Sequence, residues 1–381
     1  MSKVSVPPLY AAKETRDSAT PFSAQATGAA QKSRIPGFQR RPLQVTWEMT
    51  RACDWKATPA RMAVRAARDR QQFSTAEAFH LIEEVAGMHV PLLALTGGDP
   101  LQRPDLFPVI EFAAGHSVRT SLTLLPTPRL NAEVIAELKE CGLMRVAFWL
   151  HGSTPALHDA YLEIPGLHRR TLEIVGSCHE VQLPVQVNTI FSRRNFHDVE
   201  PMIELLTRLD VALWNVFFYV PSSREEAVQV LTADQHEEIF GKLHAASRQV
   251  HFQIKTTEGQ HYQRYLLQRR ARESRGRITA ADVLNYAPKG VNDGKGFVFI
   301  SHTGEVYPSR YLPLSGGNVM TQTLSEVYCD SELFRSLRDT SRLKGKCGRC
   351  PVRNVCGGSR ARAYAMTGDL FAAEPCCAYE P

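Results

Sequence analysis

Five cysteines lie within the last 35 residues of the chain, and their spacing is the strongest chemical signal in the sequence. Two residues separate Cys347 from Cys350, a spacing at which two thiolates in one turn can bind the same metal ion or cluster edge. Cys356 follows, and Cys376 and Cys377 could return a fourth sulfur. Their neighbours are Lys, Arg and Gly rather than apolar residues, which disfavours buried free thiols. The pattern indicates a metal site, although spacing alone does not separate zinc from iron and sulfur.

A second candidate site contains one cysteine only. Cys53 lies in the stretch RACDWKATPARM, directly after a strand-like run and before small residues and a proline. A metal site at this place would need further thiolates, because a single one does not hold a cluster. The stretch therefore raises the question of what Cys53 does alone.

The elements that must position these residues alternate regularly between residues 44 and 257. Short apolar runs are followed by stretches with helical spacing, which is typical of a parallel sheet with helical crossovers. Six or seven such units predict an α/β fold, a partial (β/α)6-type TIM-like barrel. Strands are expected near residues 44–50, 91–98, 119–125, 145–152, 184–191, 213–220 and 251–257.

In such a barrel the functional groups gather at the carboxyl ends of the strands. Cys53 follows the first predicted strand, and the turn of Gly97 to Pro100 follows the second. His151 ends the fourth strand and Asn188 the fifth. We expect all of them to face the same mouth of the barrel.

The pattern changes after about residue 290. The run GFVFISHTGEVYPS predicts a hairpin that turns at Gly304, and a helix is expected from about Thr323 to Leu337, ahead of the cysteines. The predicted organisation is a mobile N-terminal arm (1–42), the barrel (43–257), a connector (258–290) and a small C-terminal domain that carries the clustered cysteines (291–381).

Composition excludes other classes of function. The 381 residues carry a formal charge of +6 in scattered basic pairs, without the mixture of aromatic and basic residues typical of nucleic-acid binding. No apolar run approaches the roughly 18 residues of a membrane span. No apolar core of a secretory signal is present, so the cytoplasm is the expected location.

Several motifs together resemble a known family. The segment LTGGDPLQRPDL after the second strand is similar to the glycine-rich motif of radical S-adenosylmethionine enzymes. The segments GEVYPS, LKGKCGRC and VCGGSRARAYAMTGDLFAAEPCCAYEP resemble the SPASM/twitch extension of that superfamily. The resemblance runs from about Pro42 to the last residue and points to the branch of heme-biosynthesis and peptide-modifying members.

The resemblance implies cofactors and their ligands. The barrel would bind S-adenosylmethionine through Gly97, Gly98, Asp99, Pro100 and Asn188. One auxiliary 4Fe-4S cluster would be bound by Cys347, Cys350, Cys356 and Cys377, since the closing CAYEP segment matches the last cysteine of the family. Ser309 stands where many members have another cysteine, so a second auxiliary cluster is not expected. An active member would need a reductant such as ferredoxin or flavodoxin and a peptide, tetrapyrrole or small-molecule substrate.

The stretch around Cys53 departs from the family. Members carry Cys-x3-Cys-x2-Cys here, whereas this chain has Ala57 and Ala60 at the second and third positions. A methyl group cannot bind iron, so Cys53 is interpreted as the remnant of a cluster site.

Several explanations follow from this departure. The chain is a natural pseudoenzyme or binding protein, a Cys-to-Ala variant of an active enzyme, or an enzyme that recruits other ligands. A zinc-binding C-terminal module is a further alternative.

Overall fold

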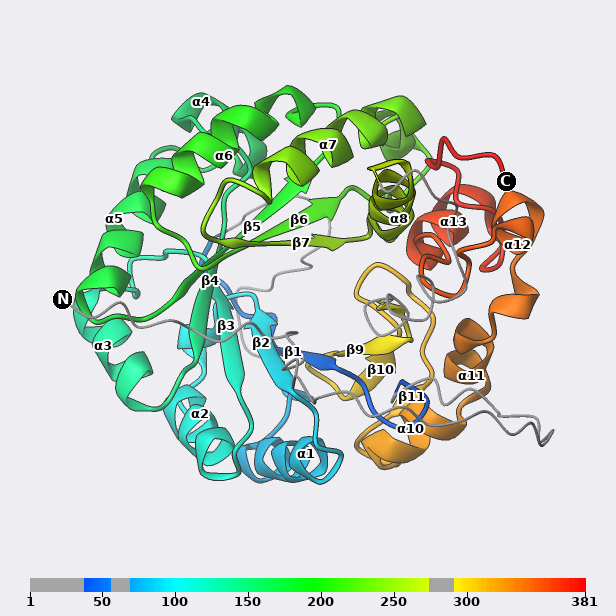
Figure 1. Ribbon diagram of the computed structural model, residues 1–381. Helices are drawn as coiled ribbons and strands as arrows, with labels where there is room; N and C mark the ends of the chain where they lie inside the picture. The colour runs from blue at the N-terminus through cyan, green and yellow to red at the C-terminus, as the bar shows by residue number, and fades with distance from the viewer. Residues whose placement is uncertain (1–37, 56–68, 274–290) are drawn as a thin grey trace, which may run out of the picture. The chain divides into compact units, whose positions relative to one another are not determined.

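The computed structural model describes residues 38–55, 69–273 and 291–381 (Figure 1). Seven strands follow one another in the sheet, and each pairs in parallel with the next. The predicted α/β fold with a parallel, partial TIM-like barrel is confirmed. The strands are β1 (Gln44–Thr50), β2 (Leu92–Gly97), β3 (Thr120–Leu124), β4 (Arg145–Trp149), β5 (Val185–Phe191), β6 (Leu213–Phe218) and β7 (Gln253–Thr257).

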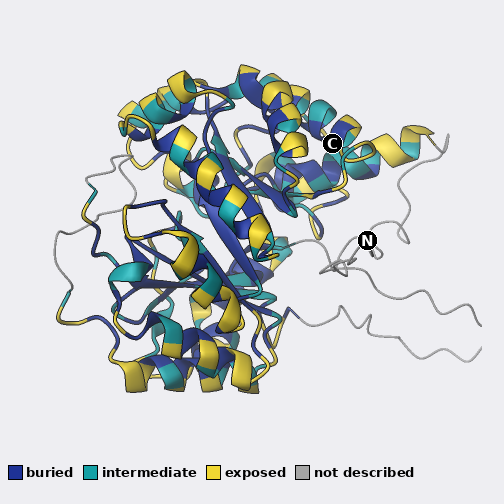
Figure 2. Cartoon of the chain, turned by 90° about the vertical axis from the view of Figure 1, so that its left-hand side faces the viewer, coloured by how far each residue is buried: buried dark blue, intermediate teal, exposed yellow. Residues whose placement is uncertain are grey.

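Helices cover the outer face of this sheet, with their apolar stripes turned inward and their polar stripes exposed (Figures 1 and 2). Local sequence fixes where two of them begin: Ser74 with Glu77, and Thr232 with Gln235, form capping boxes. The helices of the barrel are α1 (Thr75–Gly87), α2 (Leu106–Gly115), α3 (Ala132–Glu140), α4 (Pro155–Leu162), α5 (Leu167–Glu180), α6 (Val199–Arg208) and α7 (Ala233–Ala246).

The inner face of the sheet is polar. Trp149, Asn188, Asn215 and Lys255 stand in register across β4, β5, β6 and β7, so their side chains share one face. The Lys255 ammonium donates to Gln44 Oε1 at 2.9 Å and thereby connects β7 with β1. These two strands are not neighbours in the sheet, so this contact crosses the interior of the barrel.

The C-terminal part continues the same sheet. As predicted, a hairpin turns at Gly304, formed by β9 (Gly296–Ile300) and β10 (Glu305–Tyr307). β9 also pairs in parallel with β1, and all described residues fall in one compact unit. The predicted boundary near residue 290 therefore does not coincide with a break in the sheet, and the division into domains stays a prediction. Two short strands, β8 (Asn292–Asp293) and β11 (Gly317–Asn318), complete the sheet.

The helix expected from Thr323 to Leu337 is two helices, because Ser331 begins a new one: its Oγ accepts from the N–H of Phe334 at 3.4 Å. The remaining helices are α8 (His261–Glu273), α10 (Leu324–Asp330), α11 (Glu332–Arg338), α12 (Gly345–Arg349) and α13 (Arg360–Thr367). Single 3-10 turns occur at Pro100–Gln102, Phe196–Asp198, Glu225–Gln229 and Thr340–Arg342.

The end of the predicted arm contacts the C-terminal part. Phe38 is buried and its carbonyl accepts from the Tyr328 hydroxyl at 2.5 Å, while the N–H of Leu43 donates to Gly296. Residues 1–37 lie outside the described residues. In the ranges that the structure covers, none of the helices combines the length and apolar character needed to cross a membrane.

Candidate functional site

The glycine turn after β2 packs tightly against the end of β1. A Cβ atom on Gly97 or Gly98 would lie 2.4 Å from the carbonyl oxygen of Thr50 or Ala52, respectively, so only glycine fits. The N–H of Gly98 donates to Thr50 O at 2.8 Å and that of Asp99 to Ala52 O at 2.7 Å. These two donors are therefore used inside the protein, and a ligand at this turn meets acceptors instead.

Asp99 is almost completely buried and already has protein partners. Its carboxylate accepts from the Leu101 N–H at 3.1 Å and from the Thr127 hydroxyl at 3.0 Å, and it lies 4.0 Å from Arg129. Burial raises its pKa, and the hydrogen bonds from Thr127 and Leu101 oppose that rise. Pro100 follows as the first residue of a 3-10 turn that Asp99 caps. Sequence reasoning placed the segment from Leu125 to Pro128, which contains Thr127, at the mouth of the barrel, but it missed the contact of Thr127 with Asp99 and missed Arg129.

Cys53 is held close to this turn. Its side chain is buried, which raises the pKa of the thiol, while the backbone of Trp55 opposes that rise. The neighbouring Asp54 accepts from Arg129 at 3.0 Å, and Arg129 also approaches Asp99. One arginine thus connects the Cys53 loop with the glycine turn. Ala57 and Ala60 lie outside the described residues.

Asn188 lies inside β5 rather than at its end. The strand continues to Phe191, because its last three residues pair with Val216, Phe217 and Phe218 of β6. The Asn188 side chain is buried on the inner face and its Oδ1 accepts from Gln186 at 2.6 Å. β3 and β4 separate it from the glycine turn in the sheet.

Two neutral histidines form a wall after β4. The Nδ1 atoms of His151 and His158 both accept backbone N–H groups, so the ring proton of each lies on Nε2. Burial lowers the pKa of His151 well below its usual value and that of His158 to about 4, so neither is charged at neutral pH. Tyr161 stacks on His151 with 4.1 Å between ring centres, and Trp149 also stacks on His151, with 5.5 Å between ring centres. Both histidines are buried, and among the described residues the Nε2 atom of His158 has no hydrogen-bond partner.

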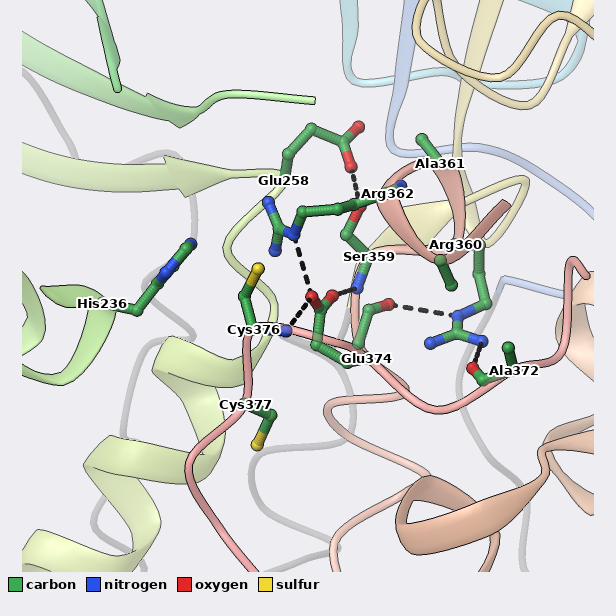
Figure 3. Close-up of polar contacts among 12 residues, drawn as sticks. His236, Glu258, Ser359, Arg360, Ala361, Arg362, Ala372, Glu374, Cys376 and Cys377 are labelled. Carbon is green, nitrogen blue, oxygen red and sulfur yellow. Dashed lines mark hydrogen bonds and ion pairs between the residues drawn. The ribbon is translucent and has the colours of Figure 1, made fainter. Parts of the chain in front are cut away.

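At the other end of the chain, four of the five clustered cysteines converge. Cys347, Cys350, Cys356 and Cys377 line one cavity of about 350 Å³, and Cys376 is not part of its lining. Figure 3 shows the sulfurs of Cys376 and Cys377 pointing in opposite directions. The loop between Cys350 and Cys356 is anchored by Val352 and Val355, which pack against Leu267 of α8.

Hydrogen-bond donors point at the sulfur atoms of this cavity. The N–H of Gly358 lies 3.4 Å from the Cys356 sulfur and that of Glu374 lies 3.3 Å from the Cys347 sulfur. The Arg264 guanidinium lies 3.9 Å from the Cys377 sulfur. Such donors stabilise thiolates that carry the charge of a metal group. The cavity therefore fits an iron-sulfur cluster in both ligand type and surroundings.

A single metal ion fits this arrangement less well. Tetrahedral zinc with Zn–S bonds of about 2.3 Å requires sulfurs about 3.8 Å apart. Among residues 38–55, 69–273 and 291–381, no three His, Cys, Asp or Glu side chains come together as ligands of one ion. Burial also raises the pKa of the Cys350, Cys356 and Cys377 thiols, so a bound metal is needed to keep them deprotonated.

A buried carboxylate fixes the chain end that carries Cys377. Glu374 accepts from the N–H of Ser359 at 2.7 Å, from Arg362 Nε at 2.8 Å and from the N–H of Cys376 at 3.1 Å (Figure 3). Burial alone would raise its pKa, but Arg362 holds the pKa below its usual value. Ser359 also donates to Glu258, which follows β7. Sequence reasoning missed this network, because Glu374 had no signal beyond its place beside the cysteines.

Comparison with known proteins matches this architecture. The family model described as the radical SAM superfamily matches residues 50–206. The AdoMet-dependent heme synthase of Methanosarcina barkeri is 35% identical over 341 residues, which cover 89% of this chain and 97% of that protein. The PqqA peptide cyclase of Rhodopseudomonas palustris is 26% identical over 351 residues, which cover 89% of this chain and 88% of that protein. The crystal structure of Streptococcus suis SuiB bound to S-adenosylmethionine has a TM-score of 0.70 at 14% identity, and the match covers 89% of this chain and 78% of SuiB.

The similarity to the heme synthase extends over 89% of this chain and 97% of that protein. The fold and the family match agree with the resemblance seen in the motifs. This chain is therefore a member of the radical S-adenosylmethionine superfamily.

Proposed function

We propose that this protein binds one auxiliary 4Fe-4S cluster through Cys347, Cys350, Cys356 and Cys377 and acts as a binding protein of the heme-biosynthesis branch. Its ligands at the barrel mouth are S-adenosylmethionine and a tetrapyrrole. Ala57 and Ala60 leave Cys53 without the partners of a radical-generating cluster. We expect the protein to act in the cytoplasm.

One observation carries the proposal: four cysteines from distant parts of the C-terminal sequence line a single cavity, with N–H and guanidinium donors at three of the four sulfurs. A protein gains nothing from burying four thiols beside such donors unless a charged group occupies the space. When bound, an iron-sulfur cluster supplies a one-electron redox centre at this place. Glu374 and Gly358 orient the sulfurs that hold it.

A tetrapyrrole is preferred over a peptide for two reasons. Three heme synthases are 32 to 35% identical to this chain, whereas the peptide cyclases are 25 or 26% identical. The inner face of the barrel also carries Lys255, which is paired only with the neutral amide of Gln44 in the contacts described for it. Burial lowers the Lys255 pKa to about 8, and a carboxylate-bearing ligand would reverse that shift.

For S-adenosylmethionine, the ligand chemistry follows from the glycine turn. The ammonium group of the ligand needs acceptors, and the Asp99 carboxylate with the carbonyl groups of the turn provides them. Asn188 faces the same barrel interior and would contact the ribose or carboxylate. Pro100 fixes the start of the 3-10 turn and so the direction of the Asp99 side chain.

Quantification of iron and sulfide after anaerobic reconstitution tests the proposal. About four irons per chain are expected, as for one cubane cluster. About eight irons would contradict the loss of the first site, and a colourless protein containing zinc would instead support a zinc module. Calorimetry with S-adenosylmethionine and with iron coproporphyrin measures the two ligands separately, and 5'-deoxyadenosine should not form under reducing conditions.

The second candidate function is an active radical S-adenosylmethionine enzyme that acts on a tetrapyrrole or peptide. The observation in its favour is the intact glycine turn with Asp99, which a protein without any ligand at the barrel mouth would not need. This candidate requires other ligands in place of residues 57 and 60, and a reductant such as ferredoxin or flavodoxin. Formation of 5'-deoxyadenosine with dithionite would establish it.

A further inference from the structure

We propose that a basic groove on α8 and the chain end is the docking site of an acidic one-electron carrier protein that reduces the auxiliary cluster. The groove has about 560 Å³ of empty space and is lined by Arg264, Arg269, Arg272, Glu237, Tyr265 and Tyr379, among others. The inference rests on the cluster of the proposed function and adds its redox partner.

The groove and the cysteine cavity share a wall. Arg264 and Tyr379 line both of them. The Arg264 guanidinium lies 3.9 Å from the Cys377 sulfur and 5.8 Å from the centre of the Tyr379 ring. Its Nη1 donates to both Glu237 and Gln268, and the Nη2 that approaches Cys377 also donates to Glu237, so the end of the side chain is fixed in place. A partner seated in the groove would therefore be one side-chain layer away from a cluster ligand.

The charge of this face indicates what the partner carries. Five cationic side chains and two carboxylates line the groove and the cavity together. One of these carboxylates, Glu374, is completely buried, and the other, Glu237, is paired with Arg264. Arg269 and Arg272 are exposed, and Arg269 shares the carboxylate of Glu273 with Arg248. Lys346 is paired with Glu380, so among the described residues only Arg272 and Arg353 of this face have no carboxylate partner. These two arginines would attract an acidic rim on a partner.

The chemistry beneath the groove selects among acidic partners. A nucleic acid or an acidic peptide would match the charge but would have no use for a redox centre below it. A flavin or iron-sulfur carrier transfers one electron and needs only contact and short distance. The reduced carrier loses one electron, the cluster gains it, and no proton or leaving group is exchanged. Tyr265 and Tyr379 supply the aromatic centre that protein interfaces favour.

Stopped-flow reduction of the reconstituted holoprotein by a reduced acidic plant-type 2Fe-2S ferredoxin tests the inference. In R269E/R272E, the second-order rate constant should fall by about tenfold or more, and its dependence on ionic strength should weaken. Reduction by dithionite should proceed at the wild-type rate. R169E on α5, which reverses the charge of an even more exposed arginine on another helix, serves as the control.

The outcomes separate the two proposals. If R269E/R272E contains about four irons and reacts with ferredoxin as fast as the wild type, the docking site is wrong while the cluster stands. If the wild type itself binds no iron, both proposals fail. R269Q/R272Q, which removes the charges without reversing them, should show an intermediate rate and keeps the test valid if the reversed variant loses iron.

Discussion

Two regions of the molecule differ in what holds them together. One is the group of residues around Cys53 at the ends of β1 and β2 (the strand-end region), and the other is the C-terminal cavity around Cys347. The glycine turn, Asp99 and Thr127 are joined by backbone and side-chain hydrogen bonds that involve no sulfur. In the cavity, by contrast, N–H groups are directed at the sulfurs of Cys347 and Cys356. The strand-end region should therefore keep its structure when its thiolates are replaced, whereas the structure of the C-terminal cavity should depend on its thiolates.

Restoring the missing thiolates at residues 57 and 60 should have the largest effect, because it would make the first site a cluster site like the C-terminal cavity. In A57C/A60C, the iron content after reconstitution should rise from about four to about eight per chain, because Cys53 regains the two partners of a cubane. Anaerobic iron and sulfide assays measure it. T58C/R61C adds two thiols at the wrong spacing and should stay near about four. An unchanged iron content in A57C/A60C would mean that the first site has lost more than its ligands.

Removing one sulfur from the cavity should have the next largest effect. C377A should lower the iron content from about four to about three or fewer, with loss of the cubane signal in electron paramagnetic resonance after reduction. C376A is the matched neighbour and should retain both, because its sulfur points away from the cavity. The reverse result would show that the adjacent cysteines exchange roles.

The strand-end region should instead lose stability when a side chain is added to its tightly packed glycine turn. In G98A, the new methyl group meets the carbonyl of Ala52, and we expect the free energy of unfolding to fall by about 1–3 kcal/mol. Urea denaturation of the metal-free protein measures it. A Cβ on Gly87 of α1 meets no atom within 4 Å, so G87A should change stability by less than about 1 kcal/mol. Equal stability of both variants would contradict the close packing.

The buried histidines after β4 make the barrel sensitive to acid. Because burial lowers the His158 pKa to about 4, protonation favours the unfolded state, and stability is lost as the pH falls from about 6.5 toward 4. The contribution of this group is at most about 1.4 kcal/mol per pH unit. H158N keeps an acceptor for the His151 N–H but cannot titrate, so its unfolding free energy should fall less steeply over this range. Identical slopes in denaturation at several pH values would remove His158 as the cause.

The smallest expected effect concerns the redox potential of the cavity. His261 lines it, is completely buried, and has no hydrogen-bond partner for either ring nitrogen. A neutral N–H donor there would stabilise the reduced cluster by about 1 kcal/mol, or roughly 40 mV. H261F should therefore shift the midpoint potential downward without loss of iron. H236F removes a neighbouring histidine that does not line the cavity and should leave the potential unchanged.

The sequence predicted the elements well and the contacts between them poorly. Short apolar runs between stretches with helical spacing located β1 to β7, because burial on both faces of a parallel sheet leaves a strong apolar signal in each strand. Short motifs marked the glycine turn and the clustered cysteines for the same reason of local spacing. The contacts of Thr127, Arg129 and Glu374 were missed because their partners lie far away in the sequence. The break at Ser331 was missed because one capping serine is a weak signal within a helical pattern.

The pairing of β9 with β1 has a consequence for how the chain folds. The first strand of the barrel is completed on its outer edge only by residues near the other end of the sequence. Until those residues leave the ribosome, β1 offers a row of unpaired N–H and C=O groups, which is a template for wrong strand pairing between nascent chains. The late arrival of such a distant strand also makes the closing step slow. Strand β9 thus also protects the earliest part of the barrel from aggregation.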